Sequence, residues 1–507
     1  MKKAFYNIKN IFTKPQPKYI YFLFFVIPFL VLFVNRLCFA NDFYTLFSVG
    51  KYIINNGFPH NLIFTIHSDF TYVPQQWLTC VLFYLIYHYF GRIGMMFFLT
   101  FLYAFIFYIS YKLCYIVSNK RSASTLFSII ICVLLSFLHV RTRPQMFDYI
   151  IILLEFIILE KYFRTDNIKY LFFLPILSIL LINFHASSFS LLFIFMIPYF
   201  IDTFSFNIFG IRGKKRKRTP LVLSLIAMLI SGFINPYGLD MITYIFRSYG
   251  NKFINLVVNE MKAPVITDKI GFFVYFVIFS VLFIYFHFKD KQIKARYFFL
   301  TLGTIFMTLL NVKSFSYFVI SSFFPLADYL SDYFAKDEEF TITKEFKKNY
   351  FIAFGFLILI TILSFIMGYN NKVANNNSIK KIANYLSKEQ KKENKKFRVY
   401  TNYDNGSYAE FKGLSVYIDP RAEAFLKSNN KKEDIFKEYY MLDYYDSDIE
   451  KFLNKYNFDY IIVSDDERLY YNYLNTNKNK KYKKVYTEKE RIEYNKYTMS
   501  YLYKRIN

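Results

Sequence analysis

The chain has little cysteine and tryptophan, and it lacks several motifs that mark soluble enzymes. Only four cysteines and one tryptophan occur among 507 residues, and no cysteine follows residue 132. The C-terminal part of the chain therefore folds without disulfides. A Walker sequence, a GxGxxG turn and an HExxH helix are all missing. The sequence thus shows no motif for binding a nucleotide or for zinc-dependent hydrolysis.

Long hydrophobic runs, by contrast, dominate the chain. With 55% hydrophobic and 22% aromatic residues, it is too apolar for an ordinary soluble domain. Since about 20 residues cross the hydrocarbon core of a bilayer, these runs predict transmembrane helices. The first run lacks an A-x-A cleavage site, so it is interpreted as a span. The predicted spans are 20–39, 93–117, 123–140, 146–163, 169–184, 187–204, 220–235, 271–288, 297–311, 314–334 and 350–368.

Acidic residues are scarce, and 63 Lys and Arg against 37 Asp and Glu give a net charge of +26. Such a charge can indicate nucleic-acid binding. Here the basic residues cluster between the spans, which is the positive-inside pattern of membrane proteins. We therefore expect a cytoplasmic N-terminus and no nucleic-acid partner. The clusters are Lys2/Lys3/Lys9, Lys120-Arg121, Arg164/Lys169, 214–218 and Lys289/Lys291/Lys294/Arg296.

The segment 77–117 is long enough for two spans, and the charge pattern decides between one crossing and two. Two crossings would place Lys120 and Arg121 outside, whereas one crossing keeps the later basic clusters inside. Trp77–Gly91 is therefore predicted to be a juxtamembrane or half-inserted helix at the outer face, where its aromatic residues suit the interface. The plasma membrane would then hold about eleven spans, with the C-terminus outside.

Long loops at 41–92 and 236–270 are predicted on the outer face, and loops of this length are usually functional. Hydrophobicity falls after Gly368. The predicted fold is an all-α polytopic membrane domain over 1–369, with about 11 transmembrane helices, and a small α/β extracytoplasmic domain over 370–507. Strands are expected at 397–403, 414–418, 460–464 and 497–504, and helices at 431–442 and 447–456.

Asp42 is the first candidate catalytic residue. It directly follows the first span and opens an amphipathic helix. Asp is a favoured N-cap residue, so helix capping is one interpretation. The other is a general base, or a group that orients an acceptor nucleophile at the membrane surface.

Charged residues gather around the turn Arg141-Thr-Arg143-Pro-Gln-Met-Phe-Asp148. Ionisable groups at membrane depth tend to be functional. Arg143 and Asp148 can form a structural ion pair. Alternatively, Arg141 and Arg143 hold a phosphate while Asp148 faces the same cavity as Asp42. Lys313 either snorkels to the surface or adds to this positive lining.

Histidine, asparagine and aromatic residues complete the candidate site. His185 ends a span as either a hydrogen-bonded helix terminus or a ligand of metal or substrate. With His60, His67 and Asp42 it could form a divalent-metal site, although no tight ligand spacing supports one. The Asn-Pro-Tyr-Gly turn at 235–238 needs no function. Further candidates are Asn183, Trp77, Asn235 and Tyr237.

The order of these motifs resembles the GT-C superfamily of polytopic glycosyltransferases, in particular the protein O-mannosyltransferases and the lipid A aminoarabinose transferases. Asp42 after the first span, Trp77-Leu78 after the first loop, and Arg143 five residues before Asp148 match that pattern. The Lys-Pro-Pro stretch of the aminoarabinose enzymes is replaced by Val73-Pro74-Gln75-Gln76, which leaves the sugar and the acceptor open.

The chain is most similar to uncharacterised bacterial members that also carry a C-terminal outer domain. The shared motifs are Asn183-Phe-His185, Asn235-Pro-Tyr-Gly238, a strand end at Gly406-Ser-Tyr408, and Asp419-Pro-Arg421. Asp419 and Arg421 are expected to pair structurally.

The resemblance implies an inverting glycosyltransferase that moves a sugar from a polyprenyl-phosphate donor to a surface glycan, teichoic acid, lipid or protein. Asp42 would be the base, assisted by Asp148 and in one version by a divalent cation. Arg141, Arg143 and Lys313 would stabilise the leaving phosphate. The alternatives are a flippase for lipid-linked saccharides, which would favour broken helices and charges near the midplane, and a non-catalytic scaffold.

Overall fold

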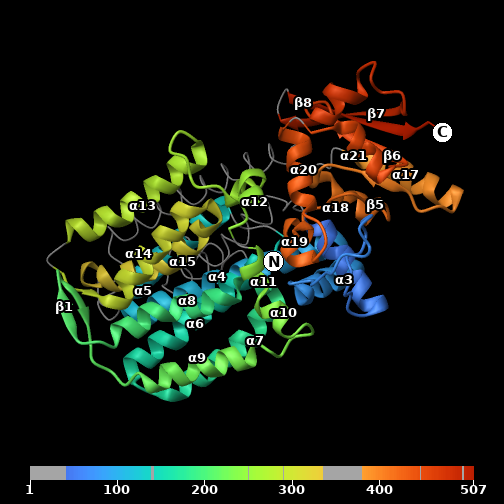
Figure 1. The fold of residues 1–507 in the computed structure, drawn as a ribbon. Helices are drawn as coiled ribbons and strands as arrows, with labels where there is room; N and C mark the ends of the chain where they lie inside the picture. The colour runs from blue at the N-terminus through green and yellow to red at the C-terminus, as the bar shows by residue number, and fades with distance from the viewer. Residues whose placement is uncertain are drawn as a thin grey trace, which may run out of the picture.

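The computed structural model describes residues 42–138, 142–248, 250–288, 291–334, 379–445, 447–493 and 496–506. The predicted spans 20–39 and 350–368 and the candidate Arg141 lie outside the described residues. The described chain is mostly helical, with a small five-stranded sheet near the C-terminus (Figure 1).

The membrane part is a bundle of apolar helices. Within the described residues, three helical stretches are long and apolar enough to cross a membrane: Trp77–Ser118, Ile168–Asp202 and Lys269–His287. The predicted total of about eleven spans stays a prediction. The helices are α4 (Trp77–Ser118), α5 (Arg121–Leu138), α6 (Gln145–Thr165), α7 (Leu174–His185), α8 (Phe189–Asp202), α9 (Thr219–Ser231), α13 (Lys269–His287), α14 (Ala295–Leu310) and α15 (Phe315–Tyr329), with 3₁₀ turns η1 (Ile168–Phe173), η2 (Ala186–Ser188) and η4 (Val312–Ser314).

Apolar side chains on this bundle face both inward and outward, as expected for helices surrounded by lipid. α13 buries Val274, Ile278 and Val281 but exposes several phenylalanines on its other face. α7 and α9 each carry proline in the first turn, where the missing N–H costs no helical hydrogen bond. A break at His185, whose φ is −160° and ψ is 82°, separates α7 from α8.

The helix α4 is interrupted at Gly91, whose φ of 61° and ψ of −156° are not helical. An unbroken helix of 42 residues would be roughly 63 Å long, about twice the thickness of the hydrocarbon core. The break divides α4 at the point where the sequence predicts that an interfacial helix ends and a span begins.

The bundle has two chemically different ends (Figure 1). One, here called the basic end, brings together residues 117–121, 164–169, 202–218, 291–296 and 328–332. Arg164 reaches the Val117 carbonyl, and Lys294 pairs with Asp328 at 2.6 Å. A three-stranded sheet of β1 (Phe206–Ile208), β2 (Ile211–Gly213) and β3 (Ile293–Lys294) closes this end.

The other end, here called the domain end, carries α3 (Asp42–Asn56), the short helices α10 (Leu239–Ile242), α11 (Tyr244–Ser248) and α12 (Lys252–Val257), the 3₁₀ turn η3 (Asn259–Met261) and the C-terminal domain (Figure 1). Trp77 lies at this end, because its indole donates to Asn183 at 2.8 Å. Ser118 lies at the basic end beside Lys120. The segment 77–118 therefore passes once between the two ends, in agreement with the charge argument.

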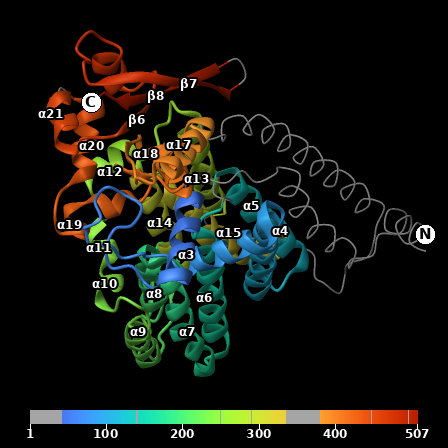
Figure 2. The same ribbon diagram turned by 90° about the vertical axis from the view of Figure 1, so that its right-hand side faces the viewer.

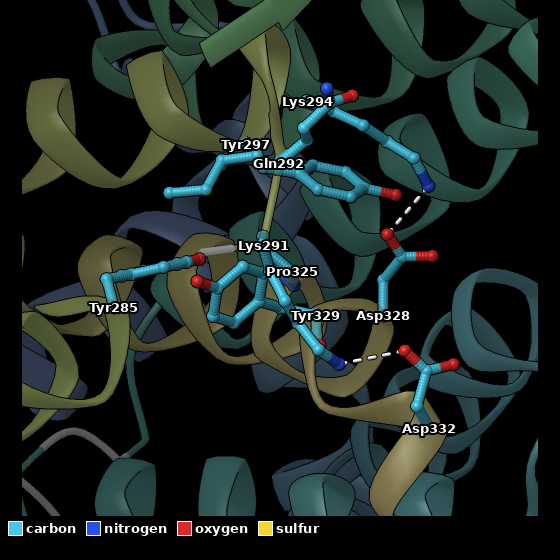
Figure 3. A pocket seen from close by; sticks show the side chains of 10 residues that line it. Tyr285, Lys291, Gln292, Lys294, Tyr297, Pro325, Asp328, Tyr329 and Asp332 are labelled. Atoms are coloured by element: carbon cyan, nitrogen blue, oxygen red, sulfur yellow. Dashed lines mark hydrogen bonds and ion pairs between the residues drawn. The ribbon is translucent and has the colours of Figure 1, made fainter. Parts of the chain in front are cut away.

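Buried ion pairs fix the basic end. Arg296 donates to Glu160 at 2.8 Å and to Asp202 at 2.6 Å, which ties α14 to α6 and α8. Beside it lies a cavity of about 240 Å³ whose lysines are paired: Lys294 with Asp328, and Lys291 with Asp332 (Figure 3).

The C-terminal domain is a mixed sheet in the order β5-β4-β6-β8-β7, with helices packed against it. β4 pairs in parallel with β5 and β6, and the hairpin β7-β8 adds antiparallel strands. The strands are β4 (Arg398–Tyr400), β5 (Ser415–Val416), β6 (Tyr460–Ser464), β7 (Tyr482–Glu493) and β8 (Lys496–Arg505), and the helices are α17 (Lys380–Glu393), α18 (Tyr403–Phe411), α19 (Lys427–Asn430), α20 (Ile435–Tyr444) and α21 (Ile449–Tyr456). One expectation was wrong: Gly406–Tyr408 lies inside α18 and not at a strand end.

The C-terminal domain rests on α3 and on the loop that follows it, with α18 directly over α3 in both ribbon views (Figure 2). Thr45 of α3 donates to Glu410 of α18 at 3.1 Å, and Tyr44 meets Tyr408 edge to face. The expected pair forms: Arg421 contacts Asp419 at 2.6 Å. The domain and the first outer loop therefore form one packed unit.

Candidate functional site

A cavity of about 2280 Å³ opens between the membrane helices and the C-terminal domain at the domain end. Its walls come from α3, the turn before α6, α8, α9, the segment 242–271, η4 and the C-terminal domain. It is large enough for a substrate that has both a lipid part and a polar part.

The centre of this cavity is an ion cluster around Arg143. Its Nε lies 3.0 Å from Oδ2 of Asp42, and its Nη1 donates to the two Glu260 oxygens at 2.5 and 2.7 Å. Burial opposes the charge of the guanidinium, but the two carboxylates outweigh it and raise the pKa of Arg143. Instead of the ion pair considered with Asp148, Arg143 forms a bridge between Asp42 of α3 and Glu260 in the loop 236–270.

The C-terminal domain adds a third carboxylate, Asp404, to this centre. Asn402 caps the start of α18 by accepting from the Asn405 N–H. A Cβ at Gly406 would lie 2.0 Å from the Ile418 carbonyl, so α18 approaches the neighbouring strand closely. Asp404 is open to the cavity, but the surrounding protein desolvates it. This desolvation, and then the charge of Asp42, raises the pKa of Asp404.

Asp148 lies behind the cavity wall and is fully buried. Its Oδ2 lies 2.7 Å from Nδ1 of His185, 2.7 Å from the Ser188 hydroxyl and 3.1 Å from the Tyr317 hydroxyl. These three partners line the cavity, whereas Asp148 does not. The expectation that Asp148 faces the same cavity as Asp42 is therefore corrected. Asp148 instead holds His185, Ser188 and Tyr317, which do line the cavity.

Lysines provide the positive charge on the membrane side of the cavity. Lys313 lies in η4, which begins where Asn311 accepts from the Ser314 N–H at 3.0 Å. Among the described residues, no carboxylate pairs with Lys313. Lys262 lies close to Lys313 along the backbone, because the N–H of the neighbouring Val312 donates to the Lys262 carbonyl. Both lysines line the cavity.

An apolar limb continues from this polar centre along α8 and α9. It is lined by Phe189, Phe193, Ile194, Ile197, Leu225, Ile226 and Leu229. Ile197 and Ile226 are about half exposed, at 53% and 50%. Since α8 and α9 both pack on α7, their outward faces form the sides of a groove at the depth of the membrane.

Four of the sequence candidates stabilise the domain end. Asn183 accepts from Trp77 and donates to the Ile234 carbonyl at 2.8 Å. Asn235 closes its own turn by accepting from the Tyr237 N–H, and the Tyr237 hydroxyl donates to the Pro59 carbonyl. These bonds hold the ends of α4, α7 and α9 against the first outer loop.

The candidate metal site is not formed. The described residues contain no group of three or more His, Cys, Asp or Glu able to hold a metal ion. His67 stacks on Phe70 inside the C-terminal domain and contacts the Tyr417 carbonyl, and burial lowers its pKa to about 4. His60 is exposed and packs on Tyr237. His185 is held by Asp148, and Asp42 by Arg143, so the residues present do not fit a shared divalent ion.

Glu260 and Asp404 were missed by sequence reasoning, although both line the cavity. Glu260 is one of three acidic residues in the loop 236–270, with Asp240 and Asp268, and Asp404 stands among the many charged residues of the C-terminal part. The length of the loop was the only signal for Glu260, and the helix-capping Asn402 was the only local signal for Asp404.

The fold is shared with solved archaeal enzymes. The oligosaccharyltransferase AglB from Archaeoglobus fulgidus, in complex with an inhibitory peptide and a dolichol-phosphate, matches with a TM-score of 0.55 at 13% identity, over 88% of this chain and 69% of that chain. An oligosaccharyltransferase of the same organism, tethered to an acceptor peptide containing the NVT sequon, matches with a TM-score of 0.50 at 13% identity, over 90% and 70%. No protein-family model and no curated protein matches the chain.

At 13% identity this likeness shows the fold alone. The shared fold, a bundle of apolar helices followed by a C-terminal domain, agrees with the GT-C resemblance. It does not single out the O-mannosyltransferase or aminoarabinose branch.

Proposed function

We propose that the protein transfers a sugar from a polyprenyl-phosphate donor to an acceptor at the outer face of the plasma membrane. One observation carries this proposal: a single cavity joins an apolar groove on α8 and α9 to a charged centre beneath the C-terminal domain. A lipid-linked sugar has this division, with an apolar tail and a charged, polar head. The dolichol-phosphate in the archaeal structure likewise has an apolar tail and a charged head.

The donor phosphate would bind beside Lys313 and Lys262. Both lysines come from the membrane part of the chain and line the same cavity as the apolar limb. Negative charge grows on the phosphate as its bond to the sugar breaks, and fixed cations stabilise that charge. Arg143 contributes less than its charge suggests, because Asp42 and Glu260 already neutralise it.

Asp42 would act as the base. Its Oδ2 is held by Arg143, and its side chain is 35% exposed to the cavity. The acceptor hydroxyl attacks the anomeric carbon of the sugar, the bond from that carbon to the phosphate oxygen breaks, and polyprenyl phosphate leaves. The hydroxyl proton passes to Asp42. Attack opposite the leaving group inverts the anomeric centre.

Asp148 would act through His185 as a positioning residue. Nε2 of His185 lies 2.8 Å from the Ser187 hydroxyl, so both ring nitrogens are engaged and the ring is fixed at the cavity wall. A flippase is less well supported. Glu155 lies midway along α6 at membrane depth, but it does not line the cavity.

The proposal is tested by purifying the full chain and identifying bound lipid by mass spectrometry, then measuring transfer by the Asp42→Asn variant. We expect wild type to retain a polyprenyl phosphate. The variant should keep the lipid and most of its thermal stability, since the Asn side-chain oxygen can still accept from Arg143 and Glu260 keeps the guanidinium paired. It should lose about 10²–10⁴ in rate. Asp240→Asn, in an exposed ion pair with Arg247, is the control. A fully active Asp42→Asn protein would exclude the catalytic role.

A further inference from the structure

Two carboxylates from separate parts of the chain contact Arg143, and a third, Asp404, lines the same cavity. Asp42 comes from α3, Glu260 from η3 and Asp404 from α18. Asp42 and Glu260 contact the guanidinium directly, at 3.0 Å and at 2.5 and 2.7 Å. Asp404 is close enough for Asp42 to raise its pKa and for Arg143 to lower it. Among the described residues, Arg143 is the cation that pairs with Asp42 and Glu260.

Converging carboxylates at a polar centre are the usual ligands of a divalent cation. Here the oxygens that would bind one already accept from Arg143. A cation bound about 2.0–2.6 Å from the Glu260 oxygens would lie against the guanidinium, and like charges at that distance repel strongly. Either the arginine or a metal can occupy this position.

We propose that Arg143 is the resident cation of this centre and that it takes the place of a divalent metal between Asp42 and Glu260. The inference rests on the proposed function for one consequence, that sugar transfer continues in the presence of a chelator. The claim that Arg143 neutralises Asp42 and Glu260 rests on their contact distances alone.

Arginine suits this role for a physical reason. Its planar guanidinium offers several N–H groups in fixed directions, so it can bind two carboxylates at once and remain charged. It also joins the turn before α6 to α3 and to the segment 252–261. The bridge therefore holds the general base and the floor of the cavity in one arrangement.

The test is Mn²⁺ binding to the full chain in detergent, followed by calorimetry and by the electron paramagnetic resonance signal of the ion. Wild type should show no saturable binding up to about 1 mM, the weak limit for carboxylate sites. Its melting temperature should not change with Mn²⁺ or with chelator. Arg143→Ala should gain a Mn²⁺ site and be stabilised by the ion, because binding to the folded state alone raises its stability.

Three further variants make the result specific. Arg143→Ala combined with Glu260→Gln should lose the gained site, and Arg143→Lys, which keeps the charge, should gain none. Arg247→Ala removes an arginine that pairs with Asp240 and does not line the cavity, and it should bind no Mn²⁺, as wild type does. If Arg143→Ala does not fold, folding of Arg143→Lys supports the counter-ion role.

Two outcomes overturn the inference. One is a wild-type Mn²⁺ site that disappears in Asp42→Asn. The other is an Arg143→Ala protein that folds, binds no Mn²⁺ and is as stable as wild type. Neither outcome depends on sugar transfer or on lipid binding, so failure of this inference and failure of the proposed function are separate results.

Discussion

Asp148 is a heavily bonded carboxylate behind the cavity wall, and one of its oxygens serves three partners. His185, Ser188 and Tyr317 come from the ends of α7, η2 and α15, so this oxygen fixes three elements at once. Removing an acceptor from a buried site leaves its donors unpaired, which costs more than the net value of the bonds.

We expect Asp148→Ala to destabilise the protein by at least about 2 kcal/mol, since three buried groups lose their acceptor. Asp148→Asn keeps a carbonyl oxygen in place and should cost less stability while still lowering transfer. Thermal unfolding in detergent, with the two variants side by side, measures the difference. An Asp148→Ala protein as stable as wild type would mean that the three groups find other partners.

His67 gives the C-terminal domain a dependence on pH. Burial lowers its pKa from 6.5 to about 4, so between these values the unfolded chain binds a proton that the folded chain does not. Stability therefore falls as the pH drops from 6.5 to 4 and is level above that window. The difference corresponds to roughly 3 kcal/mol.

His67→Phe keeps the stacking on Phe70 but cannot be protonated. Its melting temperature should fall less than that of wild type between pH 7 and pH 4, even if loss of the Tyr417 contact lowers it slightly throughout. Parallel curves for the two proteins would contradict a titrating His67.

The chemistry of single residues could be predicted from sequence only where chain position was informative. Asp42 directly follows the first predicted span, and it does line the cavity. His67 stands in the same loop, yet the loop crosses the surface of the C-terminal domain and buries the ring there. Glu260 meets Arg143 across 117 residues, and no local pattern reports such a pairing.

At the scale of elements, the glycine at position 91 divides α4 where the sequence predicts the end of an interfacial helix and the start of a span. A φ of 61° with a ψ of −156° is open to glycine and strongly unfavourable for other residues. No atom lies within 4 Å of a Cβ built there, so the obstacle is backbone strain and not crowding.

Gly91→Ala should therefore destabilise the protein by more than about 1 kcal/mol, or straighten α4 and pull Trp77 away from Asn183. The fluorescence of the single tryptophan reports the second outcome, and thermal unfolding reports the first. Gly303→Ala, in α14 with open space around it and no positive φ, is the matched control and should be neutral or stabilising. Equal behaviour of the two variants would contradict the strain argument.

Elements with strong periodicity were predictable, and elements defined by tertiary contacts were not. The apolar run Tyr460–Ser464 forms β6 with the expected limits. β7 was not foreseen, because its sequence Tyr482–Glu493 is charged on both faces and gains its structure from pairing with β8. α18 was missed because its short, polar sequence carries almost no helical pattern.

At the scale of the whole molecule, the basic clusters between the membrane helices gather at one end of the bundle, away from α3 and the C-terminal domain (Figure 1). The basic loops at 117–121, 164–169, 202–218 and 291–296 meet at one end, far from α3 and the C-terminal domain. The sequence predicted this grouping because the positive-inside pattern acts on each loop separately. It could not predict that the first outer loop and the C-terminal domain pack into one unit.

The sidedness of the membrane follows as a prediction from this sorting. Basic loops stay in the cytoplasm, so the domain end, with the cavity and the C-terminal domain, should face outward. Single cysteines at Lys120 and Lys480, in a background without the native cysteines, should react with an impermeant maleimide from opposite sides of intact cells. Lys480 should be labelled without lysis, and Lys120 only after it. Labelling of both from outside would mean that 77–118 does not pass once through the bilayer, and it would move the charged centre away from the acceptor that the proposed reaction requires.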